Sequence, residues 1–241
     1  MGYSSLVSKF MPAHKNNYQK GRGKYKICKI TPHHMAVKIT AERCGELFQN
    51  PKRYASSNYG IGYEGEIYCY VDEDNRAYTS SNKENDCQAI TIEVANSKTG
   101  GDWPISEASW NSLVNLCVDI CRRHGFRLEY TNNPNGSLTR HNMFKATTCP
   151  GPYLQSRFPE LAKTVNAILD KEVPVKTTNY YPKCTSTYKS IVDALKSIKV
   201  NSSFSNRRKI AKANGIKNYL GTAKQNTELL RLLKAGKLKK A

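Results

Sequence analysis

Residues 172–187, EVPVKTTNYYPKCTST, contain two prolines and no apolar periodicity, and they divide the sequence into two parts of different character. A segment of this kind is typical of a linker between domains. The residues before it mix apolar alternation with helical periodicity, whereas the residues after it show helical periodicity alone. We therefore predict a flexible N-terminal arm at 1–24, a larger domain at 25–171, a linker at 172–187 and a helical domain at 188–241.

The larger domain is predicted to be α/β, with a central mixed β-sheet flanked by helices. Helices are indicated where Thr40 precedes a run that stops at Pro51, and where Ser106 and Gly125 bracket a long amphipathic run. The full set is strands at 25–31 and 87–96, a hairpin at 56–73 that turns at Glu64-Gly65, helices at 40–51, 105–126 and 156–171, and a polar loop at 79–86.

The helical domain carries most of the excess positive charge. Three helical patterns, at 188–200, 204–215 and 222–238, predict a small all-α domain. Residues 185–241 hold 14 Lys and Arg against Asp193 and Glu228, in a chain of net charge +19. Such a segment favours a polyanionic partner. A soluble bundle with a solvated charged surface is the alternative, and nucleic acid is the rival polyanion.

The cysteines and the N-terminus indicate the compartment in which the chain is made. The eight cysteines include no CxxC pair, which favours thiols in a reducing cytosol. Cys117 and Cys121 lie four residues apart on an apolar helical face and are expected in the core. No apolar run is long enough for a membrane span, and the N-terminus lacks the apolar stretch of a signal peptide. We expect synthesis in the cytoplasm without a signal peptide.

A group of metal-binding side chains is indicated by SLTRHNMFKATTCPG (137–151), in which His141 precedes Cys149 by eight residues. A catalytic zinc site uses three protein ligands and leaves a fourth position for water. The best third donor lies in KITPHHMA, where His33 and His34 end the first predicted strand. Adjacent residues of a strand point to opposite sides, so only one of these two histidines can be a ligand.

A carboxylate in the apolar strand AITIEVAN is the fourth candidate. Glu93 must be paired, hydrogen-bonded or functional if it is buried there. Alternation can instead place it on a solvent-facing side of the sheet. Near a zinc ion it would be a natural general base for the bound water.

Four ordered segments, ITPHHMA, SSNYGIGYEGEIY, AITIEVAN and RHNMFKATTCPGPYL, resemble the zinc-dependent N-acetylmuramoyl-L-alanine amidase family. That family includes phage endolysins and is related to peptidoglycan recognition proteins. The resemblance covers roughly residues 25–170 and implies the fold of that family. It also implies that His33, His141 and Cys149 bind one Zn²⁺ and that Glu93 is the general base, with Thr147 beside the developing oxyanion.

The resemblance has two departures. Pro32 stands where the family often has a bulky apolar residue, and Ser57 or Asn58 stands where some relatives carry a catalytic tyrosine. The second departure shifts proton transfer to Glu93. The reaction implied is hydrolysis of the amide between N-acetylmuramic acid and L-alanine of the stem peptide. A cysteine hydrolase built on Cys149 is the weaker alternative, because the second histidine and Glu93 would then have no purpose.

Four further side chains are candidates for lining a sugar-peptide cleft, because aromatic rings stack on sugar faces. They are Tyr59, Asn96, Trp103 and Tyr153. For Trp103, packing beneath the helix at 105–126 is an equally good interpretation.

The sequence is therefore interpreted as a phage endolysin that acts on the cell wall after release from the cytoplasm. SSFSNRRKIAKANGIKNYLGTAKQN resembles the short helical wall-binding modules of endolysins from Gram-positive hosts. The partners implied are peptidoglycan and anionic wall polymers of such a host, and no nucleic acid. The alternatives are a peptidoglycan-binding protein without catalysis and, less well supported, a basic nucleic-acid-binding protein.

Overall fold

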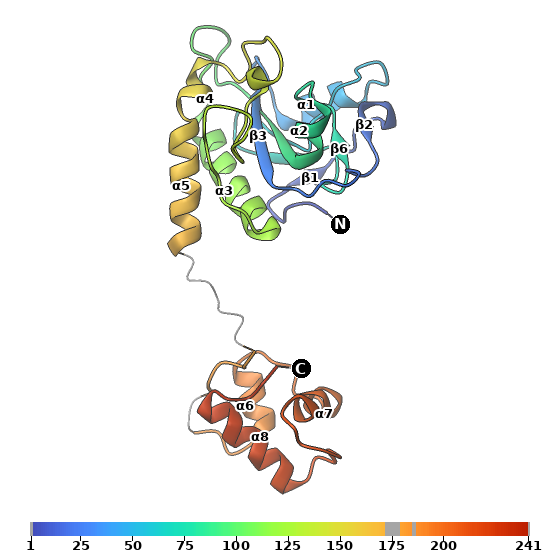
Figure 1. Cartoon of the computed structure of the whole chain (residues 1–241), viewed down its shortest axis with the longest axis vertical. Helices are drawn as coiled ribbons and strands as arrows, with labels where there is room; N and C mark the ends of the chain where they lie inside the picture. The colour runs from blue at the N-terminus through green and yellow to red at the C-terminus, as the bar shows by residue number, and fades with distance from the viewer. Residues whose placement is uncertain (1, 172–178, 185–186, 241) are drawn as a thin grey trace. The chain divides into compact units, whose positions relative to one another are not determined.

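The computed structural model describes residues 2–171, 179–184 and 187–240. The chain divides into two compact units, Met1–Glu172 and Val173–Ala241. The first unit is built on a mixed five-stranded sheet, and the second contains three helices among its described residues (Figure 1). This confirms the predicted fold class. No helix in the described ranges is both long enough and apolar enough to cross a membrane.

The sheet has the strand order β1-β5-β4-β7-β3. Its members are β1 (Lys9–Phe10), β5 (Ile67–Cys69), β4 (Tyr59–Ile61), β7 (Ala89–Val94) and β3 (Lys29–His34). Only the β4–β5 pair, the predicted hairpin, is antiparallel. A separate two-stranded sheet pairs β2 (Tyr18–Gln19) with β6 (Arg76–Ala77).

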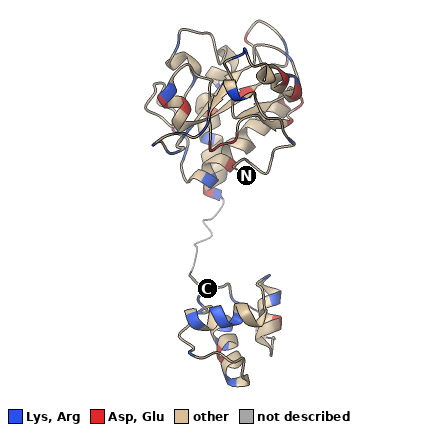
Figure 2. Ribbon diagram, turned by 90° about the vertical axis from the view of Figure 1, so that its right-hand side faces the viewer, with Lys and Arg blue, Asp and Glu red and all other residues tan. Residues whose placement is uncertain are grey.

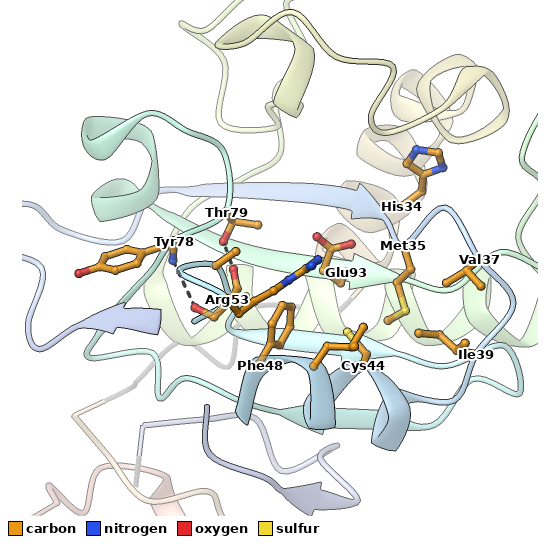
Figure 3. Close-up of a pocket in the computed structure, with 13 residues that line it drawn as sticks. His34, Met35, Val37, Ile39, Cys44, Phe48, Arg53, Tyr78, Thr79 and Glu93 are labelled. Atoms are coloured by element: carbon orange, nitrogen blue, oxygen red, sulfur yellow. Dashed lines mark hydrogen bonds between the residues drawn. The ribbon is translucent and has the colours of Figure 1, made fainter. Parts of the chain in front are cut away.

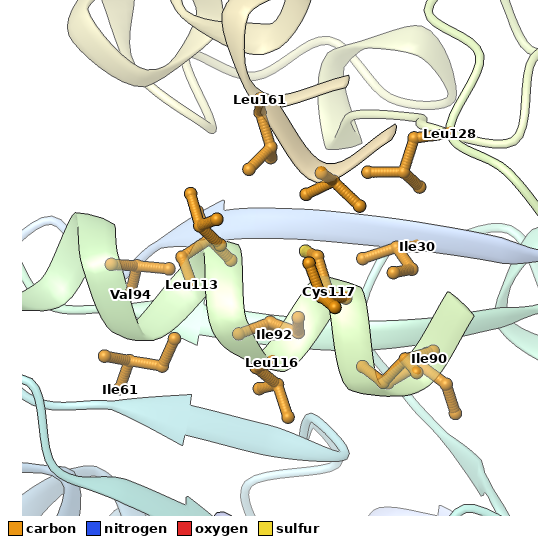
Figure 4. Packing of buried hydrophobic residues seen from close by; sticks show 14 of the residues in the cluster. Ile30, Ile61, Ile90, Ile92, Val94, Leu113, Leu116, Cys117, Leu128 and Leu161 are labelled. Carbon is orange, nitrogen blue, oxygen red and sulfur yellow. The ribbon is translucent and has the colours of Figure 1, made fainter. Parts of the chain in front are cut away.

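Strand alternation gives the sheet two different faces. Ile90, Ile92 and Val94 of β7 pack in an apolar core with α3 (Glu107–His124) and α5 (Phe158–Lys171), as Figure 4 shows. Cys117 and Cys121 lie in this core, as expected. The intervening side chains of β7 point to the opposite face, where α1 (Ala41–Gln49) packs over a second apolar cluster. The candidate site lies on that second face because His33 and Glu93 share a register position on β3 and β7.

The capped helices follow the predictions closely. Thr40 caps α1, Ser106 caps α3, and Gly125 ends α3 in the left-handed conformation with φ 71°. The last predicted helix of this unit is present as α5, preceded by the short α4 (Pro152–Ser156). The first strand begins later than predicted, at Lys29, because pairing with β7 runs from Lys29 to His34.

The prediction of a polar loop at 79–86 is wrong at its C-terminal half. Residues Lys83–Gln88 form α2, whose first turn is capped by the Asn82 side chain. The buried Asp86 carboxylate accepts hydrogen bonds from the Ser80 hydroxyl at 2.6 Å and from two backbone N–H groups. A cap and a buried polar network specify this helix, and neither produces apolar periodicity.

The prediction of a flexible arm at 1–24 is wrong for residues 2–24, which are built into the first unit. β1 pairs with β5, and the buried Asn17 amide donates to the Phe48 carbonyl at 2.6 Å. The buried Arg22 guanidinium donates to the carbonyls of Asp86 and Ala89, both at 2.9 Å. Hydrogen bonds to backbone carbonyls that are distant in sequence fix the structure of this polar segment. Its composition therefore did not indicate an ordered structure.

The second unit consists of α6 (Ile191–Ser197), α7 (Phe204–Ala213) and α8 (Ala223–Ala235) around an apolar core. The predicted linker falls partly outside the described residues, at 172–178 and 185–186. Its middle part, 179–184, was wrongly assigned to the linker. The Tyr181 N–H donates to the Leu238 carbonyl at 2.7 Å, and Cys184 is buried in the core of this unit.

Candidate metal centre

Three candidate ligands from distant parts of the sequence meet at the C-terminal end of β3. His33 lies on β3, His141 begins the 3₁₀ helix η2 (His141–Met143), and Cys149 precedes α4. One ligand atom from each residue lies within 4.8 Å of the other two. The Cys149 Sγ is 3.3 Å from the His33 Nδ1, and the His33 and His141 ring centroids are 4.9 Å apart.

The donor set and its spacing fit a zinc ion. Two imidazole nitrogens and one thiolate around a tetrahedral zinc ion lie about 3–4 Å apart. The Cys149 Sγ to His33 Nδ1 distance of 3.3 Å falls in this range, and all three ligand atoms lie within 4.8 Å of one another. The Nε2 atom of His141 is buried without a hydrogen-bond partner in the described structure. A bound metal would give buried nitrogens of this kind a partner, since such atoms rarely remain unsatisfied.

Three polar side chains, those of Thr31, Thr139 and Asn85, form a polar clamp. The clamp joins the segments that carry His33 and His141. The hydroxyls of Thr31 and Thr139 lie 2.8 Å apart, and each residue precedes a candidate histidine ligand by two positions. The Asn85 side chain of α2 bonds both hydroxyls at 3.1 Å. The missed helix α2 therefore supplies the third member of this clamp.

The His141 and Cys149 segments are also joined directly. The Asn142 N–H donates to the Cys149 carbonyl at 3.2 Å, and the Asn142 amide donates to the Gln155 side chain at 2.7 Å. The exposed Thr147 accepts a 3.3 Å hydrogen bond on its hydroxyl from the Cys149 N–H. Thr147 is thus fixed to the segment that carries the candidate sulfur ligand.

Burial sets the protonation of the group. It lowers the pKa of His33 well below its usual value, with smaller effects from His141 and His34. Burial and then Lys145 lower the pKa of His141. Both imidazoles are therefore neutral at pH 7, as metal ligands must be. Burial, assisted by Glu93, raises the pKa of Cys149, and a coordinated metal would offset this by stabilising the thiolate.

Glu93 lines a pocket of about 200 Å³ on the α1 side of the sheet. Figure 3 shows its carboxylate directed into the pocket toward the Arg53 side chain, with Met35, Cys44 and Phe48 around it. Burial raises the pKa of Glu93 to about 8, although Arg53 acts in the opposite direction. The carboxylate therefore faces a cleft, not the apolar core on the other side of the sheet.

His34 is not one of the three candidate ligands, although it lines the same pocket as Glu93. Its ring meets Trp103 edge-on, with centroids 5.4 Å apart at 87°. The two adjacent histidines thus have different environments, and His33 is the one that the structure brings to His141 and Cys149.

Two of the predicted cleft residues are wrong as direct substrate contacts, because they are fully buried. The Tyr59 hydroxyl donates to Glu73 and accepts from the Ser4 N–H at 2.9 Å. The Asn96 amide donates to the Trp103 carbonyl at 2.7 Å and so supports that loop. Strand alternation buries Tyr59, and loop packing buries Asn96. Neither kind of burial can be recognised from composition.

The other two predicted cleft residues are half-buried. Trp103 packs against His34, and the Tyr153 hydroxyl accepts from Arg157 at 2.9 Å. Their contact with substrate stays a prediction. Arg53 was missed by the sequence reasoning, since it follows α1 in an exposed stretch with no distinguishing pattern.

Comparison with known proteins gives a family match and short matches to phage proteins. A family model described as N-acetylmuramoyl-L-alanine amidase matches residues 23–152. The L-alanyl-D-glutamate peptidase of Listeria phage A118 is 60% identical over 47 residues, or 20% of this chain and 17% of that protein. The endolysin of Listeria phage A511 is 54% identical over 46 residues, or 19% and 14%. The chain thus spans about a sixth of the length of the curated relatives it matches.

Solved structures resemble the chain in fold. The structure of PlyL has a TM-score of 0.53 at 16% identity, covering 66% of this chain and 96% of that one. A selenomethionine derivative of AmpD has a TM-score of 0.51 at 19% identity, covering 67% and 97%. A mutant endolysin from Bacillus subtilis has a TM-score of 0.50 at 16% identity, covering 66% and 99%. At these identities the likeness shows a shared fold.

Proposed function

Because the chain belongs to the N-acetylmuramoyl-L-alanine amidase family, we propose that it hydrolyses the amide bond between N-acetylmuramic acid and L-alanine in peptidoglycan. The observation that carries the proposal is the convergence of His33, His141 and Cys149 within 4.8 Å of one another. Glu93 is the register partner of His33 on the adjacent strand β7, and its side chain lines a cleft on the same sheet face.

His33, His141 and Cys149 would hold one Zn²⁺, which when bound supplies a Lewis acid for the amide carbonyl and acidifies a water molecule. The ionised form of the Glu93 carboxylate accepts a proton from the attacking water as the new C–O bond forms at the carbonyl carbon. Glu93 then gives this proton to the departing L-alanine nitrogen as the C–N bond breaks. The Thr147 hydroxyl, fixed beside Cys149, donates to the developing oxyanion.

Product analysis on purified peptidoglycan tests this reaction. An amidase releases new L-alanine amino termini without new reducing sugars, and incubation with a zinc chelator abolishes the release. New reducing sugars would instead indicate cleavage of the glycan. Binding to the walls without any soluble product would support recognition without catalysis, and would refute the proposed reaction.

We further propose that the second unit holds the enzyme on the wall, as expected of a phage endolysin. The support is its charge, 14 Lys and Arg against two acidic residues over 185–241, and its own apolar core. Removing 173–241 should reduce sedimentation with walls while leaving cleavage of a soluble muropeptide within about twofold. Undiminished sedimentation of the truncated chain would refute the targeting role.

A further inference from the structure

We infer that a basic cleft on the second unit binds a phosphodiester-linked wall polymer, with Arg208, Lys209, Lys212 and Lys217 as the phosphate-contacting residues. This inference rests on the proposed attachment of the second unit to the cell wall. It adds a location on the unit, a set of residues and a chemical class of ligand.

The four cations line one hollow of about 420 Å³. Three come from α7, and Lys217 comes from the segment that follows it. Lys212 also lines a second hollow, of about 610 Å³, together with Lys237 and Lys239. The two hollows therefore share one lining cation. Figure 2 shows Lys and Arg predominating over acidic residues on the ribbon of this unit.

No acidic residue lines either hollow. Among the described residues of this unit the acids are Asp193 on α6 and Glu228 on α8. Glu228 is already paired with Arg231 at 2.8 Å. The charges of the cleft therefore lack an internal counter-charge in the described structure. An external polyanion can supply one while releasing bound counterions.

Two neighbouring arginines of α7 differ in whether their guanidinium groups are held by hydrogen bonds within the protein. The Arg207 guanidinium donates to the Tyr219 hydroxyl at 3.0 Å and to the Ser202 carbonyl. The adjacent Arg208 is exposed and makes no hydrogen bond or ion pair with any described residue. Arg207 thus fixes the wall of the cleft, and Arg208 is free to bind a ligand.

A wall polymer fits this cleft better than a nucleic acid does. Single strands are bound by stacking their bases on exposed aromatic rings. In the first hollow, which holds Arg208, Lys209, Lys212 and Lys217, the lining aromatic residue is Tyr219, and it is buried with its hydroxyl occupied. Among the described residues, Tyr180, at the second hollow, is the one partly exposed aromatic side chain that lines either of the two. A helix that reads duplex DNA must project into the major groove, whereas these cations surround a hollow. Phosphates on a flexible polyol chain require neither feature.

The test uses the full chain and fluorescently labelled poly(glycerol phosphate), with binding followed by anisotropy. The cleft variant combines Arg208→Gln, Lys212→Gln and Lys217→Gln. The control variant combines Lys189→Gln, Lys196→Gln and Lys224→Gln, which removes the same charge at exposed positions outside both hollows. We expect the cleft variant to lose at least about tenfold in affinity and the control less than about threefold. Thermal unfolding by circular dichroism verifies that both variants stay folded.

Three outcomes would overturn the inference. Equal losses in the two variants would mean that net charge alone drives binding. Absence of binding by the unmodified chain would exclude this ligand class. Tighter binding to single-stranded DNA of the same length in phosphates would assign the cleft to nucleic acid. Because none of these measurements requires hydrolysis, failure of the amidase proposal would show separately, in the product analysis.

Discussion

The hydroxyls of Thr31 and Thr139 lie 2.8 Å apart across a sequence separation of 108 residues, each two positions before a candidate zinc ligand. This contact, together with the hydrogen bond from the Thr139 N–H to the Ile30 carbonyl at 3.0 Å, holds strand β3 beside the segment leading to His141. We expect Thr139→Val, which keeps the shape and removes the hydrogen bond, to lower zinc affinity by roughly threefold to tenfold. Competition with a chromogenic chelator measures this. The control is Thr131→Val in an exposed loop, and an equal effect there would contradict the role of the clamp.

The two adjacent histidines offer a direct test of the ligand assignment. His33→Gln should lower zinc affinity by at least about a hundredfold, because one of three protein ligands is lost. His34→Gln should retain zinc within about threefold, since His34 packs against Trp103 outside the ligand group. Metal content after dialysis, measured by elemental analysis, distinguishes the two. Loss of zinc in the His34 variant alone would reverse the assignment.

Glu93→Gln separates proton transfer from metal binding. The variant keeps the shape of the side chain and removes the base, so muropeptide hydrolysis should fall by about a hundredfold to ten-thousandfold. Zinc content and thermal stability should be retained. Hydrolysis at the unmodified rate would remove Glu93 from the mechanism, and loss of zinc would make it a ligand.

Glu73 is the most deeply buried acidic member of the ion pairs described in the first unit. Its side chain is 2% exposed and receives Arg123 at 2.6 and 2.7 Å, with His124 at 2.8 Å. Glu73→Gln should lower the free energy of unfolding by about 3 kcal/mol, because it breaks a buried pair. Urea denaturation measures the loss. The exposed pair Lys9–Glu42, about half exposed on both sides, is the control, and Glu42→Gln should cost less than about 1 kcal/mol.

The lowered pKa of Glu73 predicts how the free energy of unfolding depends on pH. Burial alone would raise the pKa of Glu73, but hydrogen bonds from Arg123, His124 and Tyr59 outweigh it and lower the pKa to about 2 from 4.5. A depressed folded-state pKa contributes stability that is present above pH 4.5 and is lost as the pH falls toward 2. We expect the free energy of unfolding to fall by roughly 3 kcal/mol as the pH is lowered through this range. Glu73→Gln should flatten this part of the profile, and an unchanged slope would show that other carboxylates dominate.

Local signals predicted most of the elements that position the site. Thr40, Ser106 and Gly125 mark helix ends through short-range capping, and the structure places them at those ends. The Gly65 turn and the apolar strand β7 are equally local, since a turn and a buried run need no distant partner to be recognised. His33, His141 and Cys149 were predicted from a family pattern, and the structure brings them together.

The errors all concern groups whose state depends on distant partners. Asn85 stabilises α2 by donating to the Thr31 hydroxyl of β3, which lies 54 residues away in sequence. Arg22 orders the N-terminal segment by bonding carbonyls more than fifty residues away. Tyr59 resembles a cleft aromatic in sequence, but its hydroxyl is bound inside the core by Glu73 and Ser4. Polar hydrogen bonds over long separations leave no periodic trace in the sequence.

The sequence separation of 116 residues from His33 to Cys149 has a consequence for synthesis on the ribosome. The strand that carries His33 emerges early, yet its thiol partner follows only after the sheet and α3 have been translated. Contacts so distant in sequence form late in folding. The nascent chain therefore has no complete metal-binding group until most of the first unit has left the ribosome, so acquisition of metal would mark the end of folding for that unit.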